Sequence, residues 1–492
     1  MRVKVSTLGG FGVVFLLAVR SLGAASDARL AEAVKHQDTE AVRALLEQQV
    51  DVSAPAPDGA TALHWAAFWD DLATAGLLMR AGADVNAAND YGVTPLSIAC
   101  TNGKAPMVET LLAAGAYPNL GRTTGETPLM TCARTGSVDA VHALLAQGGD
   151  VHAREIWQEQ TALMWAVAEG HAPVVQALIE HGADVRARSK VRPQRRLSAD
   201  ANRDGHAPEE GGFTSLLFAA RAGRLDTAQM LLAAGADVNE MAADGNTALL
   251  VATVRGHMDL ATFLLDQGAD PNADGPGYTA LHWAAGLWET ELTSRDGIAA
   301  DRDDEWRALA GLPTGKVEFV RTLLSHGANP NAPGVMAPPR FGFTPGVVTM
   351  DPGTTALLLA AMAGDVSVMR VLLANGANSR LASNDGTTPL MVAAGLGRSQ
   401  MSSVTESDAL EAVELALDLG ADVNAANKAG NTALHGAASK GLNAIVRRLA
   451  DAGATVTGQN TRGQTPLDMA SPTPLRTGFP STIALLRELG GQ

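Results

Sequence analysis

The stretch Ala243–Asp274, ADGNTALLVATVRGHMDLATFLLDQGADPNAD, contains one complete structural unit of this chain. Its Asp244-Gly245 pair predicts a tight turn, because glycine adopts the positive φ of such turns without steric cost. Thr247 follows at the position of a helix N-cap, where its hydroxyl can accept from a free backbone N–H group. We therefore expect a turn followed by a short helix over Ala248–Val254.

A second helix is expected over Asp259–Asp266. Leu260, Phe263 and Leu264 stand at the i, i+3, i+4 spacing of a buried stripe, and Gly268 is placed to end the helix. Isolated helices shorter than about 12–15 residues are marginally stable in water. Two helices of this length must therefore be stacked on further copies of the same unit.

Copies of the unit fill most of the chain, and each carries the threonine equivalent to Thr247. Neighbouring copies are mostly 32–34 residues apart, with wider intervals of 53, 76 and 44 residues where the chain carries insertions. A turn and two helices at this period are typical of a helical solenoid. The marker residues are Thr61, Thr94, Thr127, Thr161, Thr214, Thr247, Thr279, Thr355, Thr388, Thr432 and Thr465.

The motifs within these units resemble those of the ankyrin-repeat family. TALHWAA begins two units, TPL begins four, and GADVNA ends two, starting at Thr61 and Thr279, at Thr94, Thr127, Thr388 and Thr465, and at Gly82 and Gly420. The resemblance covers almost all of Asp27–Gly490. It implies an all-α fold, an ankyrin-repeat solenoid of about 12 helix-turn-helix repeats with short inter-repeat β-turns. It also implies a protein-binding scaffold, although the fold names no partner.

The composition agrees with such a solenoid and narrows the class of partner. Hydrophobic residues make up 46% of the chain but aromatic residues only 4%, so the helix contacts must consist mainly of alanine and leucine. The formal net charge of −15 at pH 7 disfavours a nucleic-acid backbone as partner. We expect a monomer that binds a protein partner, with no nucleic acid and no cofactor.

Residues 1–25 stand apart from the repeats and have the pattern of a secretory signal peptide. Arg2 and Lys4 form a basic start, residues 8–19 are apolar, and the small residues up to Ala25 allow cleavage before Ser26. The alternative is an uncleaved membrane anchor, but the apolar run is short for a bilayer span. We expect a periplasmic or secreted protein that has no membrane span after signal removal.

The rest of the chain, 26–490, divides into repeats, caps and insertions. Asp27–Pro57 has a second-helix pattern without a TPLH-type entry, which predicts a polar capping repeat. In the last unit, prolines predict a short first helix, followed by a second helix over Ser481–Leu489. The predicted segments are a capping repeat 27–57, repeats 58–189, insertion 190–210, repeats 211–333 with insertion 289–315, insertion 334–352, repeats 353–460 with insertion 398–407, and a capping repeat 461–490.

The insertions fall into two classes. Those at 190–210 and 334–352 follow a GAD-type ending and lengthen turns between repeats, whereas those at 289–315 and 398–407 lengthen the connection between two helices. In the ankyrin family the inter-repeat turns line the concave groove that binds partners. The first class is therefore expected beside the groove and the second on the far edge.

Three histidines and three tryptophans are the first candidates for chemistry. His64, His282 and His435 stand in T-A-L-H tags, where they could act as metal or proton-transfer ligands. The family pattern implies instead that they are structural hydrogen-bond partners of neighbouring turns. The tryptophans occupy positions that usually hold a buried leucine, which predicts core packing for Trp65, Trp165 and Trp283.

Cys100 and Cys132 are the only two cysteines and replace small alanines in the first helices of consecutive repeats. In an exported protein such a pair could form a disulfide. Stacked helix axes are about 8–10 Å apart, whereas a disulfide needs Cα atoms within about 7 Å. We therefore expect two buried free thiols.

Basic residues cluster at the first insertion, namely Arg186, Arg188, Lys190, Arg192, Arg195, Arg196 and Arg203. This cluster could bind an acidic partner or anionic lipid, or form a solvated loop. The acidic run Asp301, Asp303, Asp304 and Glu305 lacks the loop of a calcium site and predicts a charged helix start. Because no nucleophile, phosphate-loop or zinc signature occurs, we predict neither catalytic nor metal-binding residues.

In the ankyrin family the variable groove positions are the turn residues and the two residues before the glycine that ends the first helix. Here these positions are rich in aromatic residues and arginine, which anchor interfaces. The predicted partner-binding residues are Phe68, Trp69, Tyr91, Arg134, Trp157, Phe213, Arg255, Tyr278, Leu287, Phe341, Phe343 and Met362. We expect the centre of binding on repeats 211–333, with Phe213 and Tyr278 as its hot spots. Alternatively, aromatic turn residues pack on adjacent turns and stiffen the stack.

Three functions therefore stay open. The first is a non-enzymatic scaffold that binds a protein partner through the concave groove. The second is an enzyme or enzyme subunit with an active site built by the insertions, which would need polar residues from two insertions in one pocket. The third is an envelope-structural protein whose basic loop lies on an anionic surface.

Overall fold

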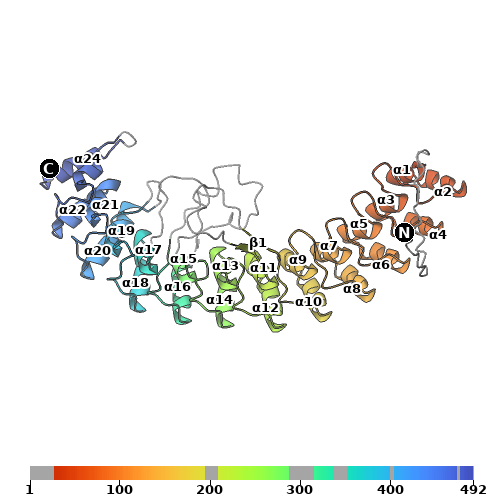
Figure 1. Ribbon diagram of the computed structural model, residues 1–492, viewed down its shortest axis with the longest axis horizontal. Coiled ribbons are helices and arrows are strands. Elements are labelled where there is room, and N and C mark those ends of the chain that lie inside the picture. The colour runs from red at the N-terminus through yellow and green to blue at the C-terminus, as the bar shows by residue number, and fades with distance from the viewer. Residues whose placement is uncertain are drawn as a thin grey trace, which may run out of the picture. The chain divides into compact units, whose positions relative to one another are not determined.

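The protein is built from pairs of short antiparallel helices, as a computed structural model shows for residues 27–193, 209–286, 315–335, 352–398, 404–473 and 477–490 (Figure 1). Within these residues, 24 helices form twelve consecutive pairs, and one two-stranded sheet is present. The predicted all-α repeat architecture is confirmed. The chain divides into two compact units, 1–123 and 124–492.

The first unit contains three helix pairs. Its first helices pack in the order α1, α3, α5, and each second helix packs on the first helix of its own pair. The pair α1–α2 shows that the N-terminal segment forms both helices of a repeat, although its sequence predicts only the second. The bounds are α1 (Arg29–Lys35), α2 (Thr39–Glu47), α3 (Ala62–Phe68), α4 (Leu72–Arg80), α5 (Pro95–Thr101) and α6 (Ala105–Ala113).

The second unit contains nine helix pairs in two rows. The odd-numbered helices from α7 to α23 each pack on the next odd-numbered helix, and the even-numbered helices from α8 to α24 form the other row (Figure 1). The bounds are α7 (Pro128–Thr135), α8 (Val138–Ala146), α9 (Ala162–Glu169), α10 (Ala172–Glu180), α11 (Ser215–Ala222), α12 (Leu225–Ala233), α13 (Ala248–Val254), α14 (Met258–Asp266), α15 (Ala280–Ala285), α16 (Lys316–Ser325), α17 (Ala356–Met362), α18 (Val366–Ala374), α19 (Pro389–Ala393), α20 (Glu406–Asp418), α21 (Ala433–Lys440), α22 (Asn443–Asp451), α23 (Pro466–Ala470) and α24 (Pro480–Glu488).

Each first helix after the N-terminal repeat begins directly after a capping threonine. Thr247 has an extended backbone, and its Oγ1 accepts from the backbone N–H of Leu250 at 3.3 Å. This bond satisfies one of the backbone donors that the first helical turn leaves free. Helix α13 matches its predicted bounds, and α14 begins one residue earlier than predicted, at Met258.

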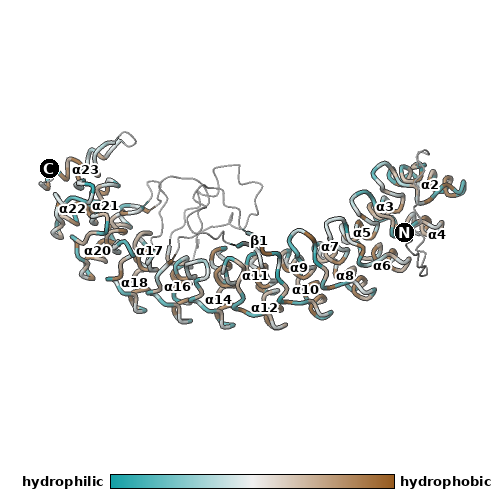
Figure 2. Tube along the Cα trace, viewed as in Figure 1, coloured by the Kyte–Doolittle hydropathy of each residue, from teal (hydrophilic) through white to brown (hydrophobic). Residues whose placement is uncertain are grey.

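The core consists of leucine and alanine, as the composition predicts. Leu249 and Leu260 are 1% and 2% exposed, and Leu264 is fully buried. Phe263 is only half-buried, so Ala261 takes its place in the buried stripe of α14. Figure 2 shows that hydrophobic segments lie along the helices and that hydrophilic residues recur in the connecting turns.

The turns between repeats are joined by backbone hydrogen bonds. In the first unit the N–H of Asp90 donates to Asp58 O, and that of Thr123 to Tyr91 O. In the second unit the corresponding donor–acceptor pairs are Ile156–Thr124, Lys190–Gln158, Ala243–Gly211, Val335–Gly277, Asn384–Pro352, Lys428–Asp385 and Thr461–Ala429, at 2.7–3.0 Å. Where the turns of Gly245 and Gly275 meet, a Cβ on Gly245 would lie 2.7 Å from the Gly275 backbone, so a side chain does not fit.

The two insertions predicted to lengthen turns begin and end in short antiparallel stems. Strand β1 (Val191–Pro193) pairs with β2 (Glu209–Gly211). At the other insertion, Gly334 forms a bridge with Thr354. Residues 194–208, 287–314, 336–351 and 399–403 lie outside the described residues, so the acidic run at 301–305 receives no structural account.

A second set of bonds joins the loops that follow the second helices. The Nδ2 of Asn272 donates to Gly327 O at 2.9 Å, and its Oδ1 accepts from the N–H of Asn329 at 2.7 Å. The same pair of bonds to the following repeat is made by Asn86, Asn239, Asn331 and Asn424. These side chains fix the spacing of successive repeats on this edge.

Replacing Leu249 by alanine should lower the free energy of unfolding by about 2–5 kcal/mol, because it leaves a cavity in the packed row of first helices. Since each repeat is stabilised mainly by its neighbours, urea unfolding followed by circular dichroism should show more than one step. Leu419, which is 40% exposed, provides the matched control. Leu419→Ala should change stability by about 0.5 kcal/mol or less. An unchanged single transition in Leu249→Ala would contradict its place in the core.

Candidate functional site

Nine of the twelve predicted binding residues lie within the described residues, and they separate into three groups by exposure. Phe68, Trp69, Tyr91, Arg134 and Trp157 are exposed, Arg255 and Met362 are half-exposed, and Phe213 and Tyr278 are buried. The remaining three, Leu287, Phe341 and Phe343, lie outside the described residues.

The prediction that Phe213 and Tyr278 face a partner is wrong. Phe213 is 7% exposed and packs beside Phe218 with ring centroids 5.6 Å apart, and Tyr278 is fully buried beside Trp283 at 6.1 Å. Each residue immediately precedes a capping threonine, and the chain directs this position inward before the helix begins. Burial raises the pKa of the Tyr278 hydroxyl. Alanine at either position would remove core packing, so neither residue is a binding hot spot.

An aromatic cluster stands at the end of α3 in the first unit. The rings of Trp65 and Phe68 meet edge to face at 5.7 Å, and those of Phe68 and Trp69 at 4.9 Å. The Nζ of Lys35 lies 5.3 Å from the Trp65 ring, and the Trp69 indole N–H donates to Lys35 O. Phe68 and Trp69 remain 48% and 44% exposed. The cluster is thus held in place while much of its apolar surface faces solvent.

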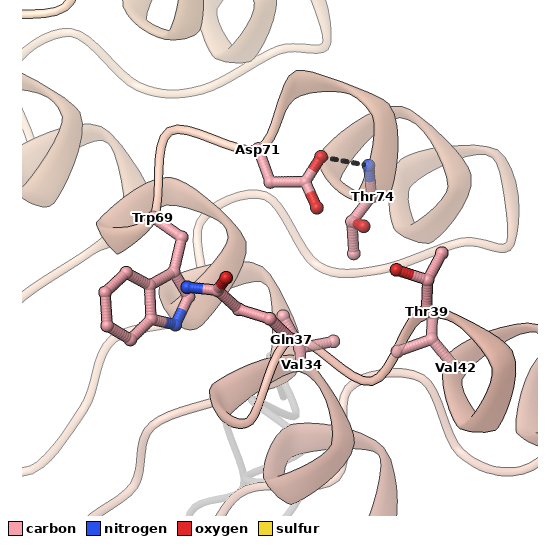
Figure 3. Close-up of a pocket in the computed structure, with 7 residues that line it drawn as sticks. All are labelled: Val34, Gln37, Thr39, Val42, Trp69, Asp71 and Thr74. Carbon is pink, nitrogen blue, oxygen red and sulfur yellow. Dashed lines mark hydrogen bonds between the residues drawn. The ribbon is translucent and has the colours of Figure 1, made fainter.

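The residue after this cluster, Asp70, replaces the glycine that ends most first helices. It adopts φ 54°, a left-handed conformation that is uncommon outside glycine, although Asp tolerates it better than most residues. Next to Asp70, the Trp69 side chain forms one wall of a cavity of about 220 Å³ (Figure 3). The other lining residues are Val34, Gln37, Thr39, Val42, Asp71 and Thr74. Asp71 caps α4 by accepting from the N–H of Thr74 at 2.9 Å, so this carboxylate already has a structural role.

Arg134, at the end of α7, is exposed but ordered by two contacts. Its guanidinium lies 5.1 Å from the ring centroid of Trp165, and one of its nitrogens lies 3.6 Å from the Glu126 carboxylate. The Trp165 indole N–H donates to Gln160 Oε1 at 2.7 Å. Such stacking of arginine on tryptophan leaves the guanidinium edge available for a further hydrogen-bonded partner.

Trp157 lies on the surface, with 69% of its area exposed. The turn that carries it is organised by the buried carboxylate of Glu155, which accepts from the N–H groups of Trp157, Gln158 and Gln160 at 2.6, 2.7 and 3.0 Å. These three bonds fix the backbone around Trp157. The side chain therefore projects from a rigid turn without a role in the core.

Of the three tryptophans predicted to pack in the core, only Trp283 is fully within it. Trp283 is 3% exposed, whereas Trp65 and Trp165 are half-buried beside their cationic neighbours.

Arg255 lies half-buried beside a small cavity that it lines with Phe213 and Asn246 among others.

Several exposed apolar residues in the turns do not stand out in the sequence. They are Ile156, Val191, Met241 and Val335, which are 46–59% exposed. They lie in the turns between repeats, where the residue type varies from one repeat to the next, so the sequence offers no signal that singles them out. Tyr117, which follows α6, is 63% exposed and was likewise missed.

The T-A-L-H histidines are structural, as predicted. The Nδ1 of His282 accepts from the N–H of Thr279 at 3.2 Å, so its Nε2 carries the proton and donates to Ala332 O and Thr354 O at 3.0 and 3.1 Å. His64 and His435 make the same capping bond and donate to one carbonyl of the next turn. Each ring thereby joins one helix start to the following repeat.

The prediction of two free thiols is wrong. Neither of the two cysteines is free, because Cys100 and Cys132 are both disulfide-bonded. The spacing of helix axes was too coarse a measure to exclude a disulfide, because it does not give the position of either Cα atom.

These helix pairs, capping threonines and joined turns agree with the sequence matches to known families. Models of ankyrin repeats match residues 30–122, 96–189, 216–292 and 314–404 in three-copy form, 415–470 in many-copy form, and 385–428 as a single repeat. The chain belongs to the ankyrin-repeat family. No curated protein sequence matches it.

Membership of the ankyrin-repeat family indicates a protein–protein interaction scaffold, and the family is typically non-enzymatic. Among the residues that the structure describes, no group of three or more His, Cys, Asp or Glu side chains is arranged to hold a metal ion. No helix in the described ranges is both long enough and apolar enough to cross a membrane.

The buried capping histidines predict an acid-sensitive ankyrin stack. Burial lowers the pKa of His282, against the opposing effect of its bonds to carbonyls. In the unfolded chain a histidine titrates near pH 6.5. Below this pH the His282 ring is protonated in the unfolded chain, whereas in the folded chain it stays neutral to a lower pH. The stability that the neutral ring contributes is therefore fully present above about pH 6.5 and declines as the pH falls toward the folded-state pKa.

The measurement is the free energy of urea unfolding at a series of pH values. The matched variant is His282→Met, because methionine already occupies the equivalent position after the capping threonine at Met164. This variant should be less stable at neutral pH and should lose less stability on acidification than the unaltered chain. An identical pH dependence in both proteins would show that His282 does not carry the effect.

Proposed function

We propose that this ankyrin-repeat protein is an exported, non-enzymatic scaffold that binds a protein partner through its inter-repeat turns and the ends of its first helices. The observation that carries the proposal is the exposure of Phe68, Trp69, Tyr91 and Trp157, between 44% and 69%, at positions with no role in the core. When a partner covers a large apolar ring, the free energy of the system falls, and this favours binding.

The way in which these rings are held supports the same proposal. The Trp69 indole is hydrogen-bonded to the preceding repeat, and the Trp157 turn is fixed by the Glu155 carboxylate. A side chain that is ordered before binding loses less conformational entropy when the partner arrives. Exposed aromatic residues on rigid supports are the usual anchors of protein interfaces.

A non-enzymatic role is favoured by the character of the cavity beside Trp69. Its volume of about 220 Å³ is below the range of about 300–1,000 Å³ that is typical of small-molecule sites. Its one carboxylate, Asp71, is already bonded as a helix cap. The histidines with lowered pKa values at 282 and 435 are likewise bonded on both ring nitrogens, so they are unsuited to proton transfer.

Export to the periplasm or the cell exterior is part of the proposal. The basic start, the apolar run at 8–19 and the small residues before Ser26 support a cleaved signal peptide. The disulfide-bonded state of Cys100 and Cys132 agrees with an oxidising compartment, where such bonds persist.

The binding role is tested by using the chain from Ser26 onward as bait for proteins of the cell envelope. The variant Trp69→Ala with Tyr91→Ala should lose the partner that the unaltered chain retains, because both rings would anchor the interface. The control is Tyr117→Ala, which removes a ring that is 63% exposed in the loop after α6. Circular dichroism should show the same folding in all three proteins. Loss of the partner only in Tyr117→Ala would contradict this choice of surface.

Export is tested separately by fractionating cells and determining the N-terminus of the chain by mass spectrometry. We expect the chain to begin at Ser26 and to be found outside the cytoplasm. A cytoplasmic chain that still begins at Met1 would contradict export without bearing on partner binding.

A further inference from the structure

The cavity beside Trp69, which we call the Trp69 pocket, is formed by the first two helix pairs of the first unit (Figure 3). Val34 of α1 and Val42 of α2 give it an apolar wall, and the Trp69 ring gives it an aromatic one. Its volume of about 220 Å³ is below the range of about 300–1,000 Å³ that is typical of small-molecule sites. A single side chain of a protein partner is therefore a better-sized occupant than a free ligand.

Three oxygen atoms of the pocket lack a hydrogen-bond partner among the described residues. Asp71 accepts from the N–H of Thr74 through Oδ1, which leaves its Oδ2 for a further donor. The hydroxyls of Thr39 and Thr74 make no hydrogen bond within the described ranges. Figure 3 shows these two side chains pointing toward each other. Because Thr74 is only 4% exposed and lines the pocket, a group that pairs with its hydroxyl must enter there.

The connections that form the pocket carry side chains where most later repeats carry glycine. Gln37 and Asp70 adopt φ 56° and 54°, a left-handed conformation that is uncommon for residues other than glycine. The equivalent residues in later repeats are Gly103, Gly136, Gly170, Gly223, Gly256, Gly364 and Gly441. The Gln37 side chain lines the pocket, and Asp70 places a carboxylate directly before that of Asp71. The unusual backbone conformation thus occurs where these side chains build and charge the pocket.

The surroundings of the pocket are negatively charged. Its two connections, residues 36–40 and 69–74, contain Asp38, Glu40, Asp70 and Asp71 but no lysine or arginine. Within the described residues none of these four carboxylates forms an ion pair. Residues 27–123 contain twelve acidic residues and six basic ones. The basic residues are Arg29, Lys35, Arg43, Arg80, Lys104 and Arg122, none of which lines the pocket.

The positive groups nearby do not offset this charge. The ammonium group of Lys35 lies 3.5 Å from the Glu32 carboxylate and 5.3 Å from the centroid of the Trp65 ring, so a ring of the same aromatic cluster already holds a lysine. Helices α2 and α4 begin at the pocket, and a helix start is equivalent to about half a positive elementary charge. Asp38 and Asp71 cap these starts with a full negative charge each, so both remain negative overall.

We propose that the Trp69 pocket binds a lysine side chain of the protein partner. An ammonium group has three donors, which match Asp71 Oδ2 and the hydroxyls of Thr39 and Thr74. The four-carbon stem packs on the apolar wall, and the Trp69 ring attracts the cation. This inference rests on the proposed scaffold function and specifies one contact of the partner.

Other occupants fit the pocket less well. A carboxylate or phosphate would meet four acidic residues and no base. An apolar side chain would bury the Asp71 carboxylate and two hydroxyls without donors, which is costly. A divalent cation would need several oxygen ligands of high charge, whereas Asp71 is the only carboxylate among the lining residues. An arginine carries its donors in a flat, rigid fork, which suits a bidentate acceptor rather than three separate oxygens.

The test selects binders for the chain from Ser26 onward from a displayed library of short random peptides. We expect the enriched peptides to share a lysine. For one such peptide, fluorescence anisotropy should show that norleucine in place of this lysine weakens affinity about tenfold to hundredfold, as expected for a hydrogen-bonded charge. Acetylation of the lysine should weaken binding to a similar extent, and arginine in its place should also bind more weakly.

The variant Asp71→Asn tests the site itself, because asparagine caps a helix as well as aspartate does and removes only the charge. It should weaken binding of the lysine peptide about tenfold and leave binding of the norleucine peptide within about twofold. Thr74→Val should weaken binding of the lysine peptide about twofold to tenfold.

The matched control is Asp38→Asn, which makes the same change in the cap of α2 without altering a lining residue. It should weaken binding by no more than about threefold, because it acts only through a solvent-screened charge. Urea unfolding of Asp71→Asn and Asp38→Asn should match that of the unaltered chain, which separates binding from stability.

The outcomes distinguish the two proposals. Enriched peptides without lysine, or no enriched peptide at all, would overturn the pocket proposal. A lysine peptide whose affinity survives Asp71→Asn, or that binds as tightly with norleucine or arginine in place of lysine, would also overturn it. The scaffold function would stand in each case if the variant Trp69→Ala with Tyr91→Ala loses its envelope partner. Retention of that partner by the variant, with no peptide enriched, would overturn both proposals.

Discussion

The structure depends on the fact that no helix in the described residues is long enough to be stable alone. Most have five to ten residues, and α20 with 13 is the longest in the described part of the chain. Each helix therefore relies on its neighbours in the two rows, and the threonine caps, the histidine bonds and the asparagine bonds all fix one repeat against the next. The same contacts that stabilise each repeat also hold it rigidly against the next repeat in the row. This rigidity also provides a row of turns whose positions are fixed before any partner arrives.

The functional surface follows from the same bonds. Hydrogen bonds from neighbouring turns hold the backbone of each turn. Turn side chains such as those of Tyr91 and Trp157 are therefore not needed for packing and can face solvent. The residue just before the capping threonine is buried in six of the repeats. Phe213 and Tyr278 occupy this position and are drawn into the core. A shift of a few residues along the turn thus separates a core residue from a candidate binding residue.

The sequence predicted the repeats, the bounds of α13 and, to within one residue, those of α14 and α24, because the pattern is repeated and each local signal agrees with the next. The bounds of α13 and the capping role of the histidines follow from Thr247 and from the T-A-L-H tags. The candidate surface was less predictable. Whether a turn residue faces inward depends on contacts with the adjacent turn, as for Tyr278, and the exposure of Ile156 and Met241 depends on hydrogen bonds that one sequence does not reveal. The disulfide-bonded state of the two cysteines was missed because a general helix spacing does not place either thiol in space.

The central claim is that the exposed aromatic turn residues contact a partner. It is tested most directly by replacing Tyr91, Trp157 or Tyr117, one at a time, with the photoreactive p-benzoylphenylalanine and irradiating cells that express the chain. All three native residues are aromatic and 63–69% exposed, so the three proteins differ mainly in the place of the probe. The account predicts cross-linked adducts to a protein from positions 91 and 157 and none from position 117. Adducts from position 117 alone would contradict it and would place the binding surface at the ends of the second helices.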